Sequence, residues 1–242
     1  MTGGERSVAR HASGHSGTLY VVSTPIGNLA DVTLRALEVL RAVDLVACED
    51  TRVTLKLLNH HGIKKRLLSF HARSGGRVSD RILEMLREGA SAAYVTDSGT
   101  PTVSDPGGVL VARVLEAGLR VVPVPGPSAV HAALAASGIP FAEYFFIGFL
   151  SSKRSRRRRR LQQVAGMDTV LVVYESPHRI LAFLQDALEV LGDLQVCVSR
   201  EITKRFETHY RGRLSQVLPR IQEEGPRGEY TVVLDARRSG EK

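Results

Sequence analysis

The sequence predicts an α/β protein built around a mostly parallel sheet. Two observations support this prediction: short apolar runs alternate with amphipathic helical patterns, and peptides rich in Gly, Pro and polar residues follow many of the apolar runs. Strands that alternate with helices favour parallel pairing, because the crossover helices cover the faces of the sheet. With 242 residues, 43% of them hydrophobic, the chain can bury a core in one large domain or in two of ordinary size.

The N-terminal half repeats a strand, loop and helix unit. In the first predicted helix, Leu34, Leu37 and Leu40 share one face, as the helical period requires. The repetition predicts a mostly parallel, five-stranded sheet covered by helices. The predicted strands are 18–22, 42–48, 67–71, 91–95 and 120–124, and the predicted helices are 31–41, 51–59, 78–88 and 108–117.

The C-terminal half follows the same pattern less regularly. The peptide PVPGPS, residues 123–128, is the best candidate domain boundary, since three prolines interrupt regular structure and Gly126 permits a turn. We therefore expect a disordered tail at 1–17 and two domains, 18–124 and 125–238. The second domain is expected to contain strands 145–149, 169–174, 194–199 and 230–235, and helices 128–136, 178–191 and 214–223.

Composition excludes several classes of protein. No apolar stretch is long enough to span a membrane, and residues 1–16 lack the apolar centre of a secretory signal. The two cysteines, Cys48 and Cys197, lie in separate apolar runs, which argues against a disulfide framework or a zinc site. The ATP-binding P-loop, the dinucleotide fingerprint and the H-E-x-x-H motif are all absent from the sequence. We expect a cytoplasmic protein that binds no membrane and no metal.

Basic residues are concentrated in one block, SSKRSRRRRR, at residues 151–160. The formal net charge of +8 indicates a polyanionic partner, although many cytosolic enzymes are also basic. A run of like charges can simply be a solvated loop or a frayed helix start. Five consecutive arginines repel one another, however, and phosphate neutralisation compensates for that repulsion. We favour contact with nucleic-acid phosphate.

Unusual peptides follow the predicted strands, where open α/β sheets bind their ligands. The most notable is TDSGTPTVSDPG, residues 96–107, whose glycines leave backbone N–H and C=O groups bare while Asp97 and Asp105 lie nearby. Such a surface suits a polar, zwitterionic small molecule. The other peptides of this kind are STPIGN, CEDTR, PGPS, YESPHR and REITK.

Seven motifs in order resemble one known family. LYVVSTPIGNLADVTLRALEVL, DLVACEDTR, YVTDSGTPTVSDPG, VVPVPGPSA, YESPHR, REITK and RGEYTVVL look like tetrapyrrole methylases, and within that superfamily like the ribosomal RNA small subunit methyltransferase I family, over residues 18–236. The resemblance implies S-adenosyl-L-methionine as cofactor and 2'-O-methylation of a cytidine ribose in the decoding region of 16S rRNA. It also implies a homodimer of chains with two α/β domains, the second around a mixed sheet, and a cofactor cleft between the domains.

The same resemblance implies which residues hold the cofactor and the RNA. Each cofactor residue could instead form an ordinary turn, with Asp105 capping the next helix. The expected cofactor-binding residues are Pro25, Ile26, Asp97, Gly99, Thr100, Pro101 and Ser128, and the expected RNA-binding residues are Arg52, Lys153, Arg154, Arg156, Arg157, Arg158, Arg159, Arg160 and Arg200.

A ribose hydroxyl is a poor nucleophile, so a positioned base is expected to assist the transfer. Glu175, Glu201, Glu49 and Asp50 are the acidic candidates at predicted strand ends, and Lys204 would qualify only if burial lowered its pKa. We expect Glu175 to be the base. Arg179 would hold a phosphate or orient that carboxylate. The facing wall of the site would contain Arg200, Glu201 and Lys204. In the alternative interpretation, Glu175 or Ser176 caps a helix and Arg179 is solvated.

Two other functions remain open at this stage. A tetrapyrrole methylase of the same superfamily would act on a porphyrinoid, and the basic block argues against it. A non-catalytic RNA-binding or ribosome-assembly protein would keep the fold but not the chemistry, and the retained loop motifs argue against that hypothesis.

Overall fold

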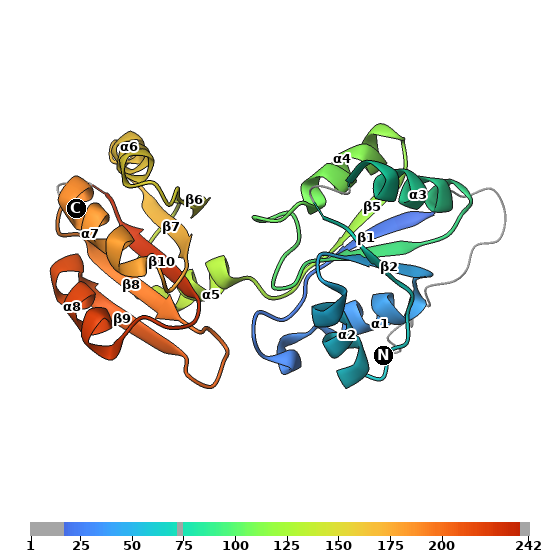
Figure 1. Ribbon diagram of the computed structural model, residues 1–242, viewed down its shortest axis with the longest axis horizontal. Coiled ribbons are helices and arrows are strands. Elements are labelled where there is room, and N and C mark those ends of the chain that lie inside the picture. Colours follow the sequence, from blue (N-terminus) through green and yellow to red (C-terminus); the bar gives the residue numbers. More distant parts are fainter. Residues whose placement is uncertain (1–16, 72–74, 238–242) are drawn as a thin grey trace, which may run out of the picture. The chain divides into compact units, whose positions relative to one another are not determined.

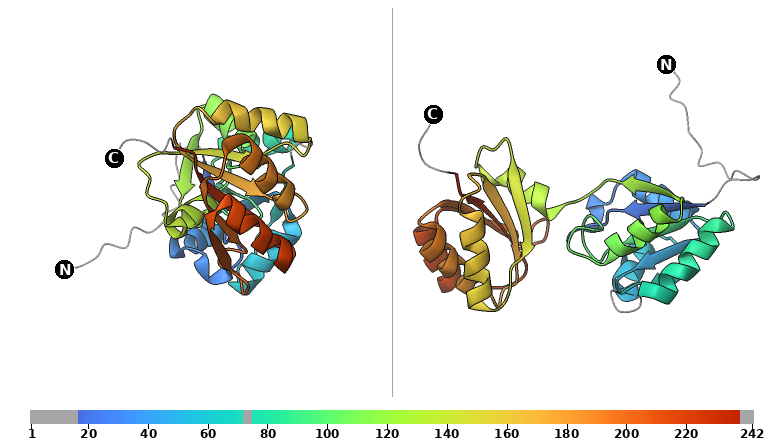
Figure 2. Two further views of the ribbon diagram at one scale, coloured as in Figure 1. Left: turned by 90° about the vertical axis from the view of Figure 1, so that its left-hand side faces the viewer. Right: turned by 90° about the horizontal axis from the view of Figure 1, so that it is seen from above.

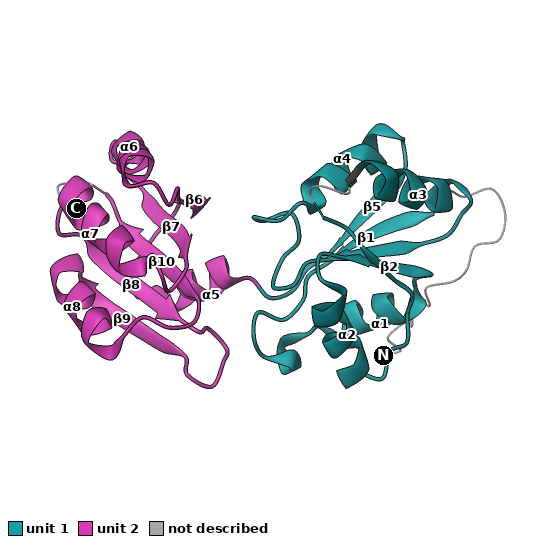
Figure 3. Cartoon of the chain, viewed as in Figure 1, with its two compact units in different colours: residues 1–127 teal, residues 128–242 magenta. Residues whose placement is uncertain are grey.

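The computed structural model describes residues 17–71 and 75–237. The chain divides into two compact units, residues 1–127 and 128–242 (Figure 3). The tail predicted at 1–17 lies, apart from Gly17, outside the described residues. Among the described helices, none is long and apolar enough to cross a membrane.

The first unit is built on five parallel strands in the order β3-β2-β4-β1-β5, which confirms the predicted sheet (Figure 1). Buried Val, Leu and Ala residues dominate the central strands, as expected for a sheet covered on both faces. The strands are β1 (Thr18–Val22), β2 (Leu45–Cys48), β3 (Leu67–Ser69), β4 (Ala92–Val95) and β5 (Arg120–Val124).

Helices cover both faces of this sheet (Figure 2). Helices α1 (Leu34–Ala42) and α2 (Thr51–His60) pack on one face, while α3 (Gly75–Arg87) and α4 (Gly107–Glu116) pack on the other. The predicted helix 31–41 begins later than expected because Thr33 caps α1, accepting a hydrogen bond from the Ala36 amide at 3.1 Å. A short 3-10 turn, η1 (Leu29–Asp31), precedes it.

The second unit has a mixed sheet in the order β6-β7-β10-β8-β9, in which only β6 and β7 pair in parallel. The strand β9 was absent from the prediction, because its sequence THYRGR lacks apolar alternation and is stabilised by pairing with β8. The strands are β6 (Tyr144–Phe149), β7 (Val170–Glu175), β8 (Gln195–Arg200), β9 (Thr208–Arg213) and β10 (Tyr230–Asp235).

Among the described residues, one helix packs on one face of the second sheet and three pack on the other. Helix α5 (Ala129–Ser137) covers the first face; α6 (Arg154–Val164), α7 (Ile180–Leu191) and α8 (Leu214–Glu224) cover the second. The basic block therefore forms a helix rather than a loop. Arg157, Leu161 and Val164 are its buried positions, spaced so that they share the face that meets the core.

Candidate active site

The loops after β1 and β4 meet at the carboxyl edge of the first sheet. The Thr24 amide donates to the Gly99 carbonyl at 3.0 Å, and the Gly99 amide donates to the Thr24 carbonyl at 3.2 Å. The Thr24 hydroxyl also donates to the carbonyl of Thr96 at 3.1 Å. Gly99 has φ of 83°, and a Cβ there would lie 3.2 Å from Ile26 Cγ2, so a side chain at this position would be strained and crowded. The structure thus brings together Ile26 and Gly99, two of the expected cofactor-binding residues.

Hydroxyl groups extend this loop contact toward the end of the first unit. The Ser23 hydroxyl donates to Thr100 Oγ1 at 3.4 Å, and Thr100 Oγ1 donates to the Pro127 carbonyl at 3.1 Å. Pro25 and Pro101 are buried within the same loops. Ser128 begins the second unit, where it caps α5: its hydroxyl accepts from the His131 amide at 3.5 Å.

Carboxylates gather at the same edge. Asp97 Oδ1 accepts from the Asp50 amide at 2.9 Å, and Glu49 Oε2 accepts from the Thr96 hydroxyl at 3.3 Å. Burial raises the pKa of Glu49, and the nearby charges of Asp97 and Asp105 raise it further. Burial likewise raises the pKa of Asp97. These two carboxyl groups therefore hold their protons more tightly than exposed ones.

Asp50 differs from its neighbours, because the hydrogen bonds of Arg52 lower its pKa to about 2. The two side chains form an ion pair at 2.6 Å, with Arg52 87% exposed. A carboxylate this acidic is a weak proton acceptor, so the structure disfavours Asp50 as the base.

Asp105 joins β4 to α4. Its Oδ1 accepts from the Tyr94 hydroxyl at 3.0 Å and from the Gly107 amide at 2.7 Å. Pro106 is the N-cap of α4 and no side chain caps the helix there, so Asp105 forms a turn ahead of α4 rather than the cap that the alternative interpretation expected. Its other oxygen, Oδ2, is buried and has no partner among the described residues. A ligand that enters this edge of the sheet would find an acceptor there.

In the second unit, Glu175 is enclosed. Its side chain is fully buried at the end of β7, and its two oxygens accept from Arg179 at 2.7 and 3.0 Å; the Ser176 amide donates to Oε1 at 2.8 Å. Arg179 also donates to the Leu150 carbonyl at 2.7 Å. We call this ion pair, with its bond to Leu150, the Glu175 clasp. It orients the carboxylate, and both oxygens of the buried Glu175 already accept hydrogen bonds.

The REITK loop carries a second bonded cluster. Lys204 donates to Glu201 Oε1 at 2.9 Å and to Glu229 Oε2 at 2.6 Å. Burial lowers the pKa of Lys204, but the two carboxylates outweigh burial, so its pKa lies above the ordinary value. Lys204 therefore stays protonated and is unsuited to the base role. Burial also opposes ionisation of Glu201, yet the bonds from Lys204 and the Glu229 amide lower its pKa.

Arg200 is the last residue of β8 and is held by neighbours on its own sheet. It donates to the Thr208 hydroxyl at 3.2 Å, lies 3.5 Å from the carboxylate of Glu224, and stacks over the ring of Tyr210 at 5.6 Å. Its side chain is 15% exposed. These contacts fix the guanidinium at the sheet edge and leave it little freedom to reach an RNA phosphate.

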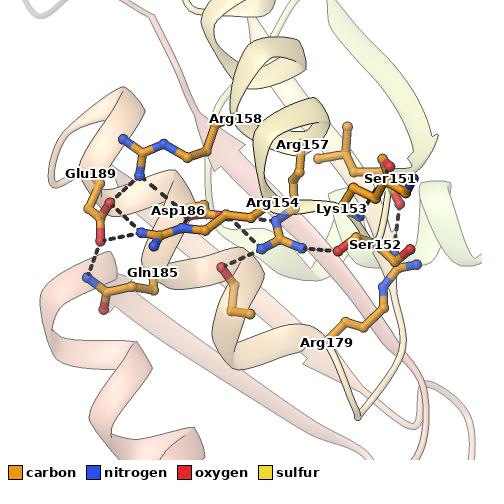
Figure 4. Close-up of polar contacts among 12 residues, drawn as sticks. Ser151, Ser152, Lys153, Arg154, Arg157, Arg158, Arg179, Gln185, Asp186 and Glu189 are labelled. Carbon is orange, nitrogen blue, oxygen red and sulfur yellow. Dashed lines mark hydrogen bonds and ion pairs between the residues drawn. The ribbon is translucent and has the colours of Figure 1, made fainter.

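The arginines of α6 fall into two groups. Arg157 is only 4% exposed and pairs with the buried carboxylate of Asp186 on α7 at 2.6 Å (Figure 4). Arg154 and Arg158 pair with Asp186 and with Glu189, one turn further along α7. The expectation that the whole run faces RNA is therefore wrong for Arg157, because its charge is buried against Asp186.

Burial opposes the charge of Asp186, but the hydrogen bonds of Arg154 and Arg157 outweigh it and hold its pKa below the ordinary value. One feature of the sequence points to the contact of Arg157 with Asp186, although it was not used in the prediction. An acidic residue at position 186 interrupts the apolar face of α7 between Phe183 and Ala187, and such a buried acid requires a cationic partner.

Comparison with known proteins identifies the family. The family model for Tetrapyrrole (Corrin/Porphyrin) Methylases matches residues 18–218. This chain belongs to that family. It is 45% identical to ribosomal RNA small subunit methyltransferase I of Thermotoga maritima over 221 residues, which is 91% of this chain and 99% of that protein. It is 43% identical to the protein of the same name from Escherichia coli O157:H7 over 234 residues, 96% of this chain and 82% of that protein.

The fold is shared more widely. A solved uroporphyrin-III-C-methyltransferase from Thermus thermophilus is similar with a TM-score of 0.63 and 21% identity, covering 91% of this chain and 95% of that chain. At this identity the likeness concerns the fold alone.

S-adenosyl-L-methionine is the methyl donor of this family. The first unit offers groups that fit it: backbone without a side chain at Gly99, the carboxylate of Asp97 for a positive charge, and Asp105 Oδ2, which has no partner among the described residues. For a metal ion the described residues provide no group of three or more suitable side chains.

Proposed function

We propose that this protein transfers a methyl group from S-adenosyl-L-methionine to the 2'-hydroxyl of a cytidine in the decoding region of 16S rRNA, with the small ribosomal subunit as substrate and a homodimer as the active form. The observation that carries the proposal is the identity of 43% or more, over nine-tenths of this chain, to proteins named for methylation of small subunit rRNA. The choice of cytidine and of the 2'-oxygen rests on the resemblance of the seven motifs.

The first unit would hold the cofactor. The loops at the sheet edge contain Pro25, Ile26, Gly99, Thr100 and Pro101, and Asp97 presents a carboxylate there. When bound, the cofactor supplies an already activated methyl group. The protein must then align the ribose oxygen and exclude water, which can lower the barrier by roughly 7 kcal/mol or more.

Removal of the ribose proton falls to Glu49 in our proposal. Its pKa is raised, and its carboxylate accepts one long hydrogen bond from Thr96, so it combines basicity with an available oxygen. Glu175 and Arg179 act as positioning residues through Leu150. The Lys204 ammonium is already paired with Glu201 and Glu229, so in our proposal it fixes the loop that carries it.

Methyl transfer from labelled S-adenosyl-L-methionine to small ribosomal subunits that lack the modification tests this function. We expect label on a single 2'-O-methylcytidine of 16S rRNA after nucleoside mapping, and none on a porphyrinoid run in parallel. Label on the porphyrinoid alone, or cofactor binding without transfer to RNA, would refute the proposed substrate.

The solvent-facing arginines of α6 are expected to supply the phosphate contacts. Replacing Arg156, Arg159 and Arg160 by Ala should weaken rRNA binding and reduce the slope of log affinity against log salt by about 2 to 3, since each phosphate contact contributes about 0.7 to 0.9. Affinity for S-adenosyl-L-methionine should stay unchanged. The measurement is filter binding over a salt series.

A matched control removes the same charge elsewhere. Arg77, Arg81 and Arg87 are exposed on α3 of the first unit, and their replacement by Ala should leave the salt slope near that of the wild type. Equal slopes for both triple variants and the wild type would contradict the role of α6.

A further inference from the structure

An aromatic ring is exposed at the end of the edge strand of the second sheet. Phe149 is the last residue of β6, and 58% of its surface is accessible to solvent. Single exposed apolar side chains are common on protein surfaces, so the exposure of this ring does not by itself establish a partner. Neighbouring groups indicate a partner and its nature.

A β-bulge determines where the ring points. The register of β6 against β7 shifts between Phe146 and Gly148, and Gly148 has φ of 73°, which a glycine adopts without strain. In a regular strand, residues 146 and 149 would lie on opposite faces. Because of the bulge, both rings contact Tyr174 on the face that carries α5.

The ring rests on a rigid support. Phe146 and Tyr174 lie 4.9 Å apart between ring centres, and Tyr174 and Phe149 lie 5.6 Å apart. The next residue, Leu150, is buried, and its carbonyl is held by Arg179 in the Glu175 clasp. A ring packed on Tyr174, next to a backbone fixed at Leu150, loses less conformational entropy when a ligand stacks on it than a free ring would.

Positive charge lies on α6, which packs on the other face of the sheet from the Phe149 ring. Arg154 and Arg158 turn toward α7, so the helical period places Arg156 and Arg160 on the opposite side of α6. Arg160 lies over the ring of Phe145, at the start of β6, at 5.7 Å. Lys153, Arg156, Arg159 and Arg160 are all exposed; we call them the α6 outer flank. Lys153 follows Phe149 by only four residues, so the flank starts near the exposed ring.

We propose that Phe149 is a stacking platform for an unpaired base of the RNA substrate, whose neighbouring phosphates contact the α6 outer flank. Proteins hold single-stranded RNA by combining exposed aromatic rings with basic residues that contact the phosphates. Here the ring and the α6 outer flank lie on opposite faces of the sheet beside the edge strand β6, so a bound strand would pass around that edge. A purely anionic ligand would need the charges alone, whereas a nucleotide strand uses both the ring and the charges. This inference rests on the proposed function and adds to it the site that receives a splayed base.

Phe149→Ala and Phe149→Trp test the platform. RNA affinity of the alanine variant should fall roughly 5- to 150-fold, the range found for loss of one stacking aromatic, while the tryptophan variant should bind about as tightly as the wild type. The probe is a single-stranded oligoribonucleotide carrying 2-aminopurine, whose fluorescence is quenched on stacking. The quench should persist with Trp and disappear with Ala.

Phe141→Ala is the matched control, since this ring is 40% exposed in the same unit but packs on Tyr144, near the other end of β6. It should leave both affinity and quench unchanged. Unchanged RNA affinity of the Phe149→Ala variant would overturn the inference. It would also be overturned if Phe149→Ala changed the protein from dimer to monomer in sedimentation while the quench was retained, because the ring would then be a subunit contact. If the wild type itself neither binds nor methylates rRNA, the proposed function fails instead.

Discussion

Glu49→Gln is expected to lower kcat for rRNA methylation about 100- to 10,000-fold with little change in the KM for S-adenosyl-L-methionine, because an amide keeps the shape of the side chain but cannot accept the ribose proton. The raised pKa of Glu49 also predicts a pH dependence. The base must be deprotonated, so kcat of the wild type should fall as pH drops through that raised pKa. The measurement is kcat against pH under saturating substrate, and the variant should lose this limb.

Glu175→Gln is the matched comparison, since it makes the same chemical change at the other leading candidate. It weakens the Glu175 clasp on Leu150, so the main effect should be on KM for the ribosomal substrate and on stability. If instead Glu175→Gln abolishes the pH-dependent limb and Glu49→Gln retains it, the base is Glu175. Circular dichroism of both variants checks that each is folded.

Asp186→Ala is expected to destabilise the second unit by about 3–5 kcal/mol, since it leaves the Arg157 guanidinium buried without its partner. Hydrogen exchange at the amides of α6 is the measurement, because it reports on this unit separately from the first. Protection of α6 should fall, and rRNA affinity should fall with it as the outer flank loses its fixed orientation.

Two further variants distinguish the effect of losing the buried ion pair from a nonspecific loss of stability. Glu189→Gln, at a partly exposed pair, should cost less than about 1 kcal/mol, and Asp186→Leu combined with Arg157→Met should recover much of the loss. The lowered pKa of Asp186 determines the pH range in which this ion pair stabilises the second unit. The stabilisation is present above the unfolded carboxyl value of about 3.9 and is lost as pH falls through the lower folded value. Equal protection in Asp186→Ala and wild type would contradict the assignment.

Local sequence pattern was sufficient for most of the fold. The alternation of apolar runs and helical faces predicted each strand of the first sheet, since a buried parallel strand must be apolar along its whole length. It failed for β9, whose residues THYRGR are held by pairing with β8 rather than by their own pattern. Glycine and proline located the loops around Gly99, because few other residues tolerate that backbone conformation.

The sequence by itself determined the order of elements, the loops that carry polar groups and the presence of a strongly basic segment. Only the tertiary structure decided which charges are free. Arg157 and Arg156 are neighbours of identical chemistry, yet one is buried against Asp186 and the other faces solvent, because helical geometry and the position of α7 separate them. The same holds for the acids: Glu175 is enclosed by Arg179, whereas the pKa of Glu49 is raised by burial and by carboxylates that come from another strand. Residues far apart in sequence set these environments, so no local pattern could reveal them.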